Sequence, residues 1–298
     1  MTATPAPAAP PTHTGAGRRG GLLTGLLLLP AGAWYLGLLV LPILIVIVYS
    51  FGVRGPDGGY APALTLDNYA IVFERPQPFL TSLFLAISGT ALCLLVAFPL
   101  AYFIASRGGK RKGLFIILLV IPFWTSFLIR TISWLVILGP RGITGFIEGA
   151  TGADIQILGT PTAILIGIVY NYLTLMVFPL YVTLERLDRT LLEASKDLGA
   201  GRWATFRQVT LPIIWPGLIT GSILVFIPLM GEYVIPAILG NGKVFLIGNV
   251  LQLDFLSSRN WPAGSAKAVV LIAIMLISVT FYVWITNRGR RGRDVSVL

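Results

Sequence analysis

Few titratable side chains in this sequence stand where they could do chemistry. The chain has 12 Asp and Glu residues, 1 His and 1 Cys. His13 lies in an N-terminal tail rich in Ala, Pro, Thr and Gly, and Glu232 is the one acidic residue well inside a long apolar segment. Catalysis needs titratable groups that the fold can bring together, and a metal centre needs several Cys, His, Asp or Glu ligands. The sequence therefore predicts neither an enzyme nor a metal site.

Glu232 has a candidate counterion in another apolar segment. If straight helices begin at Gly113 and Ile213, Arg130 lies about 26 Å and Glu232 about 28 Å from their starting ends, at 1.5 Å per residue. A charge inside a bilayer is costly unless it is paired or faces water. We therefore expect either a structural ion pair or a polar cavity that opens toward the outer face, and the two roles can coexist.

Three uncharged residues extend this polar set. Asn171 falls near the middle of its apolar segment, where an amide needs a hydrogen-bond partner or water. Trp124 and Tyr233 lie near a membrane edge, where such rings are more often interfacial anchors. Together with Glu232 and Arg130, these residues are candidates to line a path for a solute that carries both charge and alkyl surface.

The composition places all of these residues in a membrane. Hydrophobic residues make up 55% of the chain, charged residues 11%, and the mean hydropathy is +0.84. Spanning segments must be helices, because an open sheet leaves polar backbone groups unsatisfied in lipid. The sequence predicts an all-α integral membrane protein with six transmembrane helices, at about residues 22–51, 79–106, 113–138, 161–184, 213–239 and 263–287.

The basic residues give the expected orientation. With both termini in the cytoplasm, 15 of the 22 Lys and Arg residues fall in cytoplasmic segments, as the positive-inside rule requires. The net charge of +10 is then a consequence of topology. The basic residues are spread over several segment ends with little aromatic interleaving, which argues against nucleic-acid binding. We expect a multi-pass membrane protein, and the resemblance described below implies the bacterial plasma (inner) membrane.

The ends of the chain fall outside the predicted core of residues 79–286. Residues 1–21 have the composition of a disordered cytoplasmic tail. A signal peptide is the alternative there, but the apolar run continues well past a cleavage site at residues 31–33, which favours an uncleaved first helix, 22–51. An extracytoplasmic loop, 52–78, contains either a surface helix or an irregular loop, and residues 287–298 form a basic cytoplasmic tail.

A polar, glycine-punctuated stretch, residues 191–212, separates the fourth and fifth spans. Leu192 and Ser195 fall at helical spacing, Gly199 should end this first helix, and Trp203 and Phe206 stand three apart in a second short one. We therefore expect a helix, a glycine bend and a second helix outside the membrane.

The same stretch resembles the EAA loop of permease subunits of binding-protein-dependent ABC importers of type I. The matching positions are Glu193, Ala194, Ser195, Gly199, Val209, Leu211 and Pro212. Ser195 replaces an alanine and Val209 an isoleucine, and both changes are small. In that family the loop forms the coupling helix that docks into a groove of the cytoplasmic ATPase.

The resemblance implies a set of partners. These are a second homologous permease subunit, two cytoplasmic ATPase subunits, an extracytoplasmic binding protein and the lipid bilayer, but no nucleic acid. No Gly-x4-Gly-Lys-Ser/Thr motif occurs in the sequence, so we expect ATP and Mg²⁺ on the ATPase subunits and no cofactor on this chain. A secondary carrier is the alternative, although it would be expected to place coupling carboxylates near the midplane, where only Glu232 is available.

A second resemblance narrows the solute. Residues 222–266 are similar to the first permease subunit of spermidine/putrescine importers, through landmarks such as 231–233, 247–249 and 261–262. This implies transport of a small cationic polyamine. Related subfamilies carry ferric iron, aminophosphonates or opines, and those solutes stay open. Lys267 stands where the resemblance leads us to expect an apolar residue.

Overall fold

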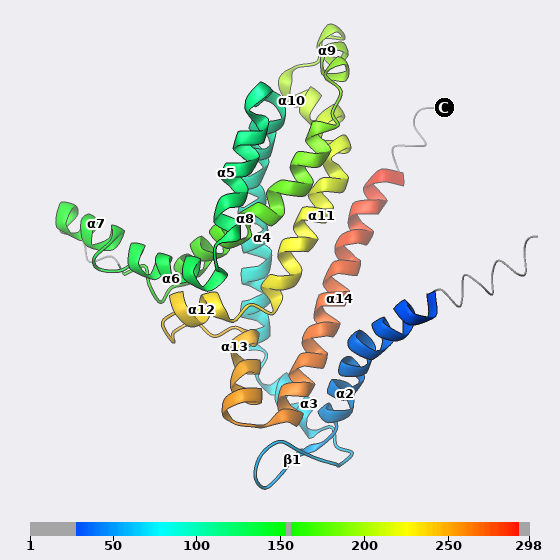
Figure 1. Ribbon diagram of the computed structural model, residues 1–298, viewed down its shortest axis with the longest axis vertical. Helices are drawn as coiled ribbons and strands as arrows, with labels where there is room; N and C mark the ends of the chain where they lie inside the picture. The colour runs from blue at the N-terminus through cyan, green and yellow to red at the C-terminus, as the bar shows by residue number, and fades with distance from the viewer. Residues whose placement is uncertain (1–27, 153–155, 292–298) are drawn as a thin grey trace, which may run out of the picture.

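The computed structural model describes residues 28–152 and 156–291 (Figure 1). The predicted tail 1–21, the start of the first span and residues 292–298 of the predicted basic tail lie outside this range. Five described helices are long and apolar enough to cross a membrane, and a bent pair can make a sixth span. The five helices cover Leu28–Ser50, Gln77–Arg107, Pro161–Glu185, Arg202–Met230 and Trp261–Ile285. The predicted all-helical membrane fold is confirmed.

The remaining elements connect these spans. The first span contains η1 (Leu36–Val40) and α2 (Leu41–Ser50); the other long helices are α4 (Gln77–Arg107), α8 (Pro161–Glu185), α11 (Leu211–Met230) and α14 (Trp261–Arg291). Shorter elements are β1 (Val53–Arg54), β2 (Tyr60–Ala61), α3 (Asp67–Glu74), η2 (Gly109–Arg111), α7 (Ile143–Thr151), α13 (Ile247–Gln252) and η4 (Leu253–Ser257). Helix α3 decides between the two expectations for loop 52–78 in favour of a helix.

The third predicted span is not one straight helix. Helix α5 (Lys112–Trp124) and helix α6 (Phe127–Ile137) meet at 90°. Pro122 lacks an N–H and weakens the helix, and both the amide and the hydroxyl of Thr125 donate to the Pro122 carbonyl, which closes the end of α5. The straight span 113–138, and the depth of Arg130 counted along it, are therefore wrong.

The fifth predicted span also breaks before its expected end. Short helix α10 (Arg202–Thr205), η3 (Phe206–Thr210) and α11 run on as one helix to Met230, and a new helix, α12, covers Val234–Leu239. Glu232 thus lies in a break between two helices, whereas a straight span 213–239 would place it inside one. Pro236 falls in the first turn of α12, where a missing N–H removes no intrahelical bond.

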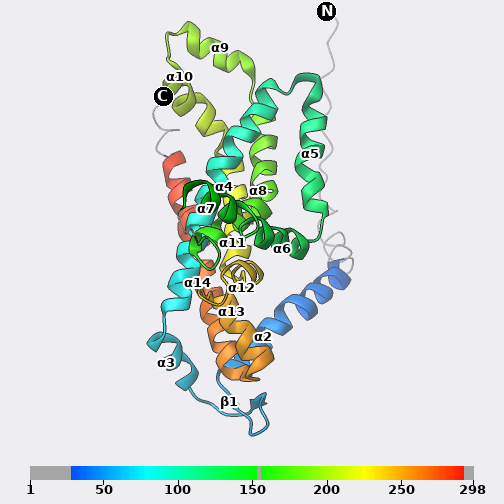
Figure 2. The ribbon, with the colours of Figure 1, turned by 90° about the vertical axis from the view of Figure 1, so that its left-hand side faces the viewer.

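Helices α4, α8 and α11 form the packed centre of the bundle (Figures 1 and 2). Close approach depends on glycines, and Gly217 and Gly221 have the four-residue spacing of small residues that is typical of closely packed membrane helices. A Cβ on Gly217 would lie 2.2 Å from the Thr183 hydroxyl oxygen, and one on Gly221 would lie 2.8 Å from the Met176 sulfur. Helix α11 therefore packs against α8 with no room for a side chain at either position.

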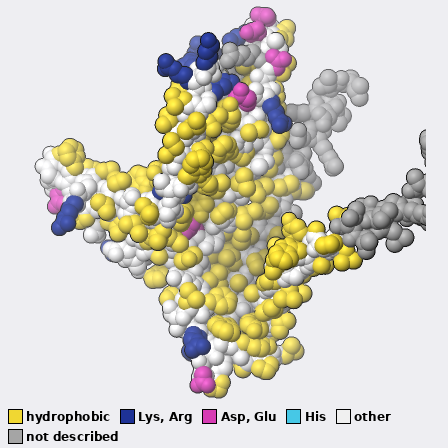
Figure 3. All heavy atoms as spheres, viewed as in Figure 1, with side chains coloured by type: hydrophobic (Ala, Val, Ile, Leu, Met, Phe, Trp, Pro, Cys, Tyr) yellow, Lys and Arg dark blue, Asp and Glu magenta, His cyan; other side chains and the backbone are white. Residues whose placement is uncertain are grey.

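The molecule has two polar ends. Figure 3 shows hydrophobic side chains over the middle of the bundle and Lys and Arg side chains gathered at the end that carries α9 (Arg189–Asp197). The opposite end carries the two-stranded hairpin of β1 and β2. Tyr60 of this hairpin stacks on Tyr49 with ring centroids 4.2 Å apart, and Tyr49 stacks on Trp261 at the start of α14. The hairpin is thereby tied to the outer turns of two spans.

Candidate functional site

The stretch 191–212 folds as its residue pattern predicts. Helix α9 begins after Asp188, whose side-chain Oδ1 accepts a hydrogen bond of 2.9 Å from the Thr190 amide. This backbone bond, with one from the Thr190 hydroxyl, holds the pKa of the Asp188 carboxyl below its usual range. Helix α10 follows after a bend. The helix, bend and second helix form one unit at the α9 end of the molecule (Figure 1); this unit, residues 189–212, is called the coupling loop below.

Gly199 makes the bend through its backbone conformation. Its φ is +78°, which L residues with a Cβ rarely adopt. The Ala200 amide donates to the Ser195 carbonyl at 3.0 Å, and the Gly199 amide to the Lys196 carbonyl at 2.8 Å, so the last turn of α9 is capped. A Cβ at Gly199 would meet nothing within 4 Å. The glycine is therefore required by the turn and not by close approach within this chain.

Ser195 also finds a partner. Its hydroxyl lies 3.0 Å from the Thr205 hydroxyl, and the bond joins α9 to α10 across the bend. Glu193 and Ala194 are exposed on α9, whereas Leu211 and Pro212 are half-buried where α11 begins. The loop thus leaves one face exposed and joins the other to the start of the fifth span.

The second group of candidate residues gathers around the two helix breaks. Glu232 is 6% exposed, and its carboxylate accepts three hydrogen bonds. The Tyr172 hydroxyl donates to Oε2 at 2.5 Å, while the amides of Val234 and Ile235 donate to Oε1 at 2.8 and 3.2 Å. The two amides belong to the first turn of α12, so the carboxylate caps this helix and stabilises the break before it.

Arg130 does not pair with Glu232. The two ion pairs among the described residues are Lys112–Glu185 and Lys267–Asp254. Arg130 is 7% exposed, its guanidinium lies 5.6 and 5.9 Å from the ring centroids of Phe123 and Phe127, and its Nε is buried without a hydrogen-bond partner. The expectation of a structural ion pair is wrong. The break after Trp124 redirects α6, and the carboxylate is already satisfied by Tyr172 and two amides.

Asn171 connects α8 to α6. Its Nδ2 donates to the Gly167 carbonyl at 2.9 Å and to the Thr131 hydroxyl at 3.4 Å, while its Oδ1 is buried without a partner. The candidate site thus contains one buried donor, Arg130 Nε, and one buried acceptor, Asn171 Oδ1, that the chain leaves unsatisfied. Burial of such groups without a partner is costly, which favours a partner from outside this chain.

The other path candidates lie on the surface of the chain. The Trp124 side chain is 82% exposed and Tyr233 is 44% exposed. The residue pattern does not single out Tyr172 as the donor to Glu232. No sequence signal marks this contact, since 60 positions separate the two residues. No group of three potential metal ligands occurs in the described ranges.

Comparison with known proteins identifies the family. Residues 97–291 match the family model described as "binding-protein-dependent transport system inner membrane component". The chain belongs to this family. It is therefore the membrane permease subunit of an ABC importer, a multi-pass protein of the inner membrane, and a transport component rather than an enzyme.

Individual relatives agree with this assignment. The permease is 40% identical over 255 residues to the spermidine/putrescine transport system permease protein PotB of Haemophilus influenzae, covering 84% of this chain and 89% of that protein. It is 38% identical over 260 residues to PotB of Escherichia coli K12, covering 86% and 94%. Both resemblances inferred from the residue pattern, to importer permeases and to the spermidine/putrescine subfamily, are confirmed.

Solved structures support the fold. A bacterial ABC transporter involved in the import of the acidic polysaccharide alginate has a chain that matches the permease with a TM-score of 0.67 at 17% identity, covering 91% of this chain and 96% of that one. A chain of the MetNI methionine ABC transporter matches with a TM-score of 0.54 at 16% identity, covering 75% and 97%. At this identity the likeness concerns the fold alone.

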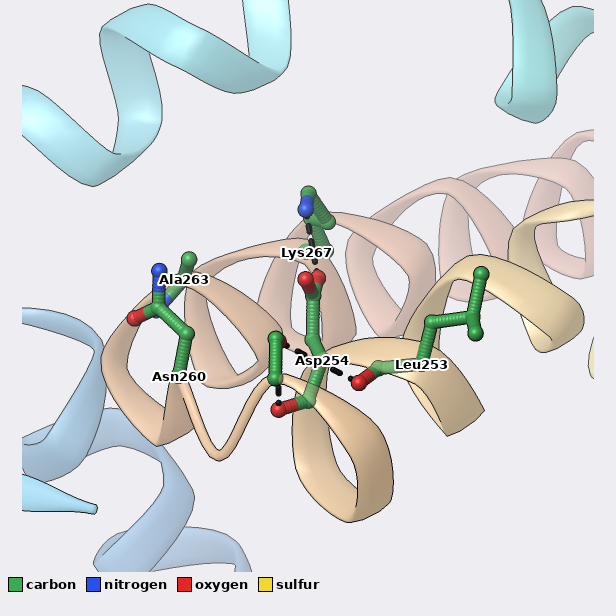
Figure 4. Close-up of polar contacts among 6 residues, drawn as sticks. Leu253, Asp254, Asn260, Ala263 and Lys267 are labelled. Carbon is green, nitrogen blue, oxygen red and sulfur yellow. Dashed lines mark hydrogen bonds and ion pairs between the residues drawn. The ribbon is translucent and has the colours of Figure 1, made fainter. Parts of the chain in front are cut away.

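Lys267, the unexpected cation in the permease, has its own counterion. It lies on α14 and pairs with Asp254 of η4, and the two side chains are 17% and 16% exposed (Figure 4). A Cβ on Gly264, one turn before Lys267, would lie 3.2 Å from the Asp254 Cβ, so the helices meet closely here. The ion pair therefore adds no net charge to this end of the bundle.

Proposed function

We propose that this permease forms half of the translocation pathway for a small cationic solute, a polyamine of the spermidine/putrescine class. The observation that carries the proposal is the similarity to PotB proteins, at 38–40% identity over most of both chains. Lys267 is paired with Asp254, so its charge does not oppose a polycation near this end.

The arrangement around the helix breaks supports a site for an amine. Discontinuous membrane helices commonly frame the solute sites of transporters, because their ends expose polar groups to a cavity. Glu232 supplies a carboxylate and Asn171 supplies an acceptor that has no partner in the chain. The ring of Phe127, which meets Tyr172 edge-on with centroids 6.2 Å apart, supplies apolar surface for an alkyl segment. Ammonium groups and methylene segments would both find matching surfaces here.

Arg130 has a different part in the proposal. An unpaired guanidinium on Phe123 and Phe127 opposes the entry of a cation unless a carboxylate offsets it. Glu232 would provide this offset as the solute passes. Trp124 and Tyr233, both exposed on this chain, would complete the passage at its boundary with the second permease subunit.

The coupling loop would connect this passage to ATP. We propose that Glu193, Ala194, Ser195 and Gly199 dock on an ATPase subunit, and that Leu211 and Pro212 transmit its movement. The helix Arg202–Met230 runs without a break from the coupling loop and ends two residues before Glu232. A rigid element of this kind can carry a displacement at one end to the other during rigid-body rocking of the spans.

The complete importer would contain a second homologous permease, two ATPase subunits and an extracytoplasmic binding protein. ATP and Mg²⁺ would bind to the ATPase subunits. In this assembly both termini of the permease would be cytoplasmic and loop 52–78 would face outward. Residues 22–51 would form the first helix and residues 79–286 the type-1 transmembrane domain of an ABC importer, with residues 1–21 and 287–298 as cytoplasmic tails.

The proposal is tested by uptake. The permease, its partner permease, the ATPase and the binding protein are expressed together in cells that lack their own polyamine importers, and entry of labelled spermidine and putrescine is measured. We expect ATP-dependent uptake that needs the binding protein and that excess unlabelled polyamine abolishes. Absence of polyamine uptake, with uptake of a labelled aminophosphonate or opine by the same importer, would contradict the proposed substrate while leaving the importer assignment intact.

A further inference from the structure

A cavity lies beneath the coupling loop, well away from the helix breaks. It is open to the surface, has a volume of about 740 Å³, and is lined by the last turns of α4, by α9 and by the helix that begins with α10. In Figure 1 this region is at the α9 end of the bundle, while α12 lies near the other end of α11. Its lining includes three cations and three aromatic rings: Arg107, Lys196, Arg202, Phe98, Tyr102 and Phe206.

The charges of this cavity are unbalanced. Arg107, Lys196 and Arg202 come from three different elements, and no Asp or Glu of the described chain lines the space with them. None of the three belongs to either ion pair formed within the described ranges. On α9 the acidic residues Glu193 and Asp197 do not line the cavity, and in the described ranges neither forms an ion pair with Lys196. The cavity therefore favours an anionic ligand.

The cavity is also amphipathic along its length. Phe98 and Arg107 both line it from α4, and the nine-residue separation corresponds to about 13 Å along the helix. At the end of the cavity away from Arg107, the ring of Phe98 packs against the rings of Tyr102 and Phe206, with centroids 6.1 and 5.6 Å apart. A water-soluble anion would match the cations but not the aromatic end of the cavity. A molecule with an anionic head and hydrocarbon tails covers both ends.

We infer that this cavity binds an anionic phospholipid of the surrounding membrane. Its phosphate would lie among Arg107, Lys196 and Arg202, and its acyl chains against Phe98 and Phe206, because basic pockets between membrane helices are suited to such headgroups. Lys196 and Arg202 stand on either side of the Gly199 bend. The bound lipid therefore bridges α4 to both halves of the coupling loop. This inference does not depend on which solute the permease carries.

The test measures retained lipid directly. The assembled importer is placed in nanodiscs with equal amounts of phosphatidylglycerol and phosphatidylcholine, and the lipids that remain bound after release are identified by native mass spectrometry. The double variant Lys196→Gln with Arg202→Gln should retain phosphatidylglycerol about 30-fold less strongly, from the loss of two cations near an anionic group. The matched control Lys110→Gln with Arg111→Gln removes two charges at the same end of the molecule but outside the cavity. This control should retain phosphatidylglycerol as strongly as the unmodified importer does.

Another variant separates charge from folding. Exchanging the two cations, Lys196→Arg with Arg202→Lys, keeps the charge and should keep the lipid. Equal retention by the cavity variant and the control would overturn the inference, as would equal binding of the two lipids to the unmodified importer. Displacement of the lipid by soluble glycerol phosphate would assign the cavity to a water-soluble anion. Loss of the ATPase from the cavity variant, with lipid retained, would assign these cations to the ATPase contact.

Discussion

At the scale of single residues, Glu232 has a structural role and a proposed role toward the solute, and a mutation can separate the two. Its carboxylate caps α12 and accepts from Tyr172, but it forms no ion pair with any cation of the described residues. Glu232→Gln keeps an acceptor for the two amides, so we expect a loss of stability of only about 1 kcal/mol. Uptake should fall at least tenfold and fall more for the polyamine of higher charge, because a Coulomb attraction in a partly dry site is lost. Solute uptake and thermal unfolding in detergent measure the two effects.

Two further variants test this assignment. Tyr172→Phe removes the donor to Glu232 and keeps the carboxylate. It should therefore lower the thermal stability but leave the preference for the polyamine of higher charge in place. Adding Arg130→Gln to Glu232→Gln should restore neither property, since no ion pair joins these residues in the described structure. Recovery of both uptake and stability in that double variant would rule out a solute role for Glu232.

At the scale of elements, the bend of the coupling loop depends on one backbone conformation. Gly199 has φ +78°, whereas Gly201 has φ −67° and ψ 164°, an extended conformation that β-branched residues adopt readily. Neither Cβ would meet an atom within 4 Å. Gly199→Val should therefore misplace α9 and uncouple ATP hydrolysis from uptake, while Gly201→Val should have a much smaller effect. Hydrolysis stimulated by the loaded binding protein is compared with uptake, and membrane insertion is followed by expression level.

The variant Gly199→Asn is the control for this comparison. Asn tolerates the left-handed region better than other residues with a Cβ, so Gly199→Asn should keep much of the coupling. If Gly199→Val retained full coupling, the bend would not be what presents α9 to the ATPase. If Gly201→Val were equally damaging, contact with the partner subunit at both glycines would be the better explanation.

At the scale of the whole molecule, the contact between α8 and α11 joins the coupling end to the helix breaks. A methyl group at Gly217 would lie 2.5 Å from the Pro179 carbonyl oxygen as well as against Thr183. Gly217→Ala should force the helices apart and destabilise the permease by about 1–3 kcal/mol. Gly113→Ala, at a helical position with nothing within 4 Å, should be neutral or slightly stabilising. Thermal unfolding of both variants measures the difference, and equal melting temperatures would contradict this account of the packing.

The sequence by itself determined the features that depend on neighbouring residues. Long apolar runs specified the membrane helices, since every backbone group in lipid must be paired within its own segment. The spacing from Leu192 to Pro212 specified a helix, a glycine bend and a second helix, because capping and left-handed backbone are local properties. The same local pattern carried the resemblance to importer permeases, which the family match confirms.

Only the tertiary structure decided how the charged residues are partnered. Arg130 and Glu232 have opposite charges and similar positions along their segments. The breaks after Trp124 and Met230, however, redirect the helix that follows in each segment. Glu232 instead accepts from Tyr172, and Lys267 pairs with Asp254 of η4. A hydrogen-bond partner is chosen by the packing of distant helices, and hydropathy and spacing along one segment carry no information about which distant helix packs against it.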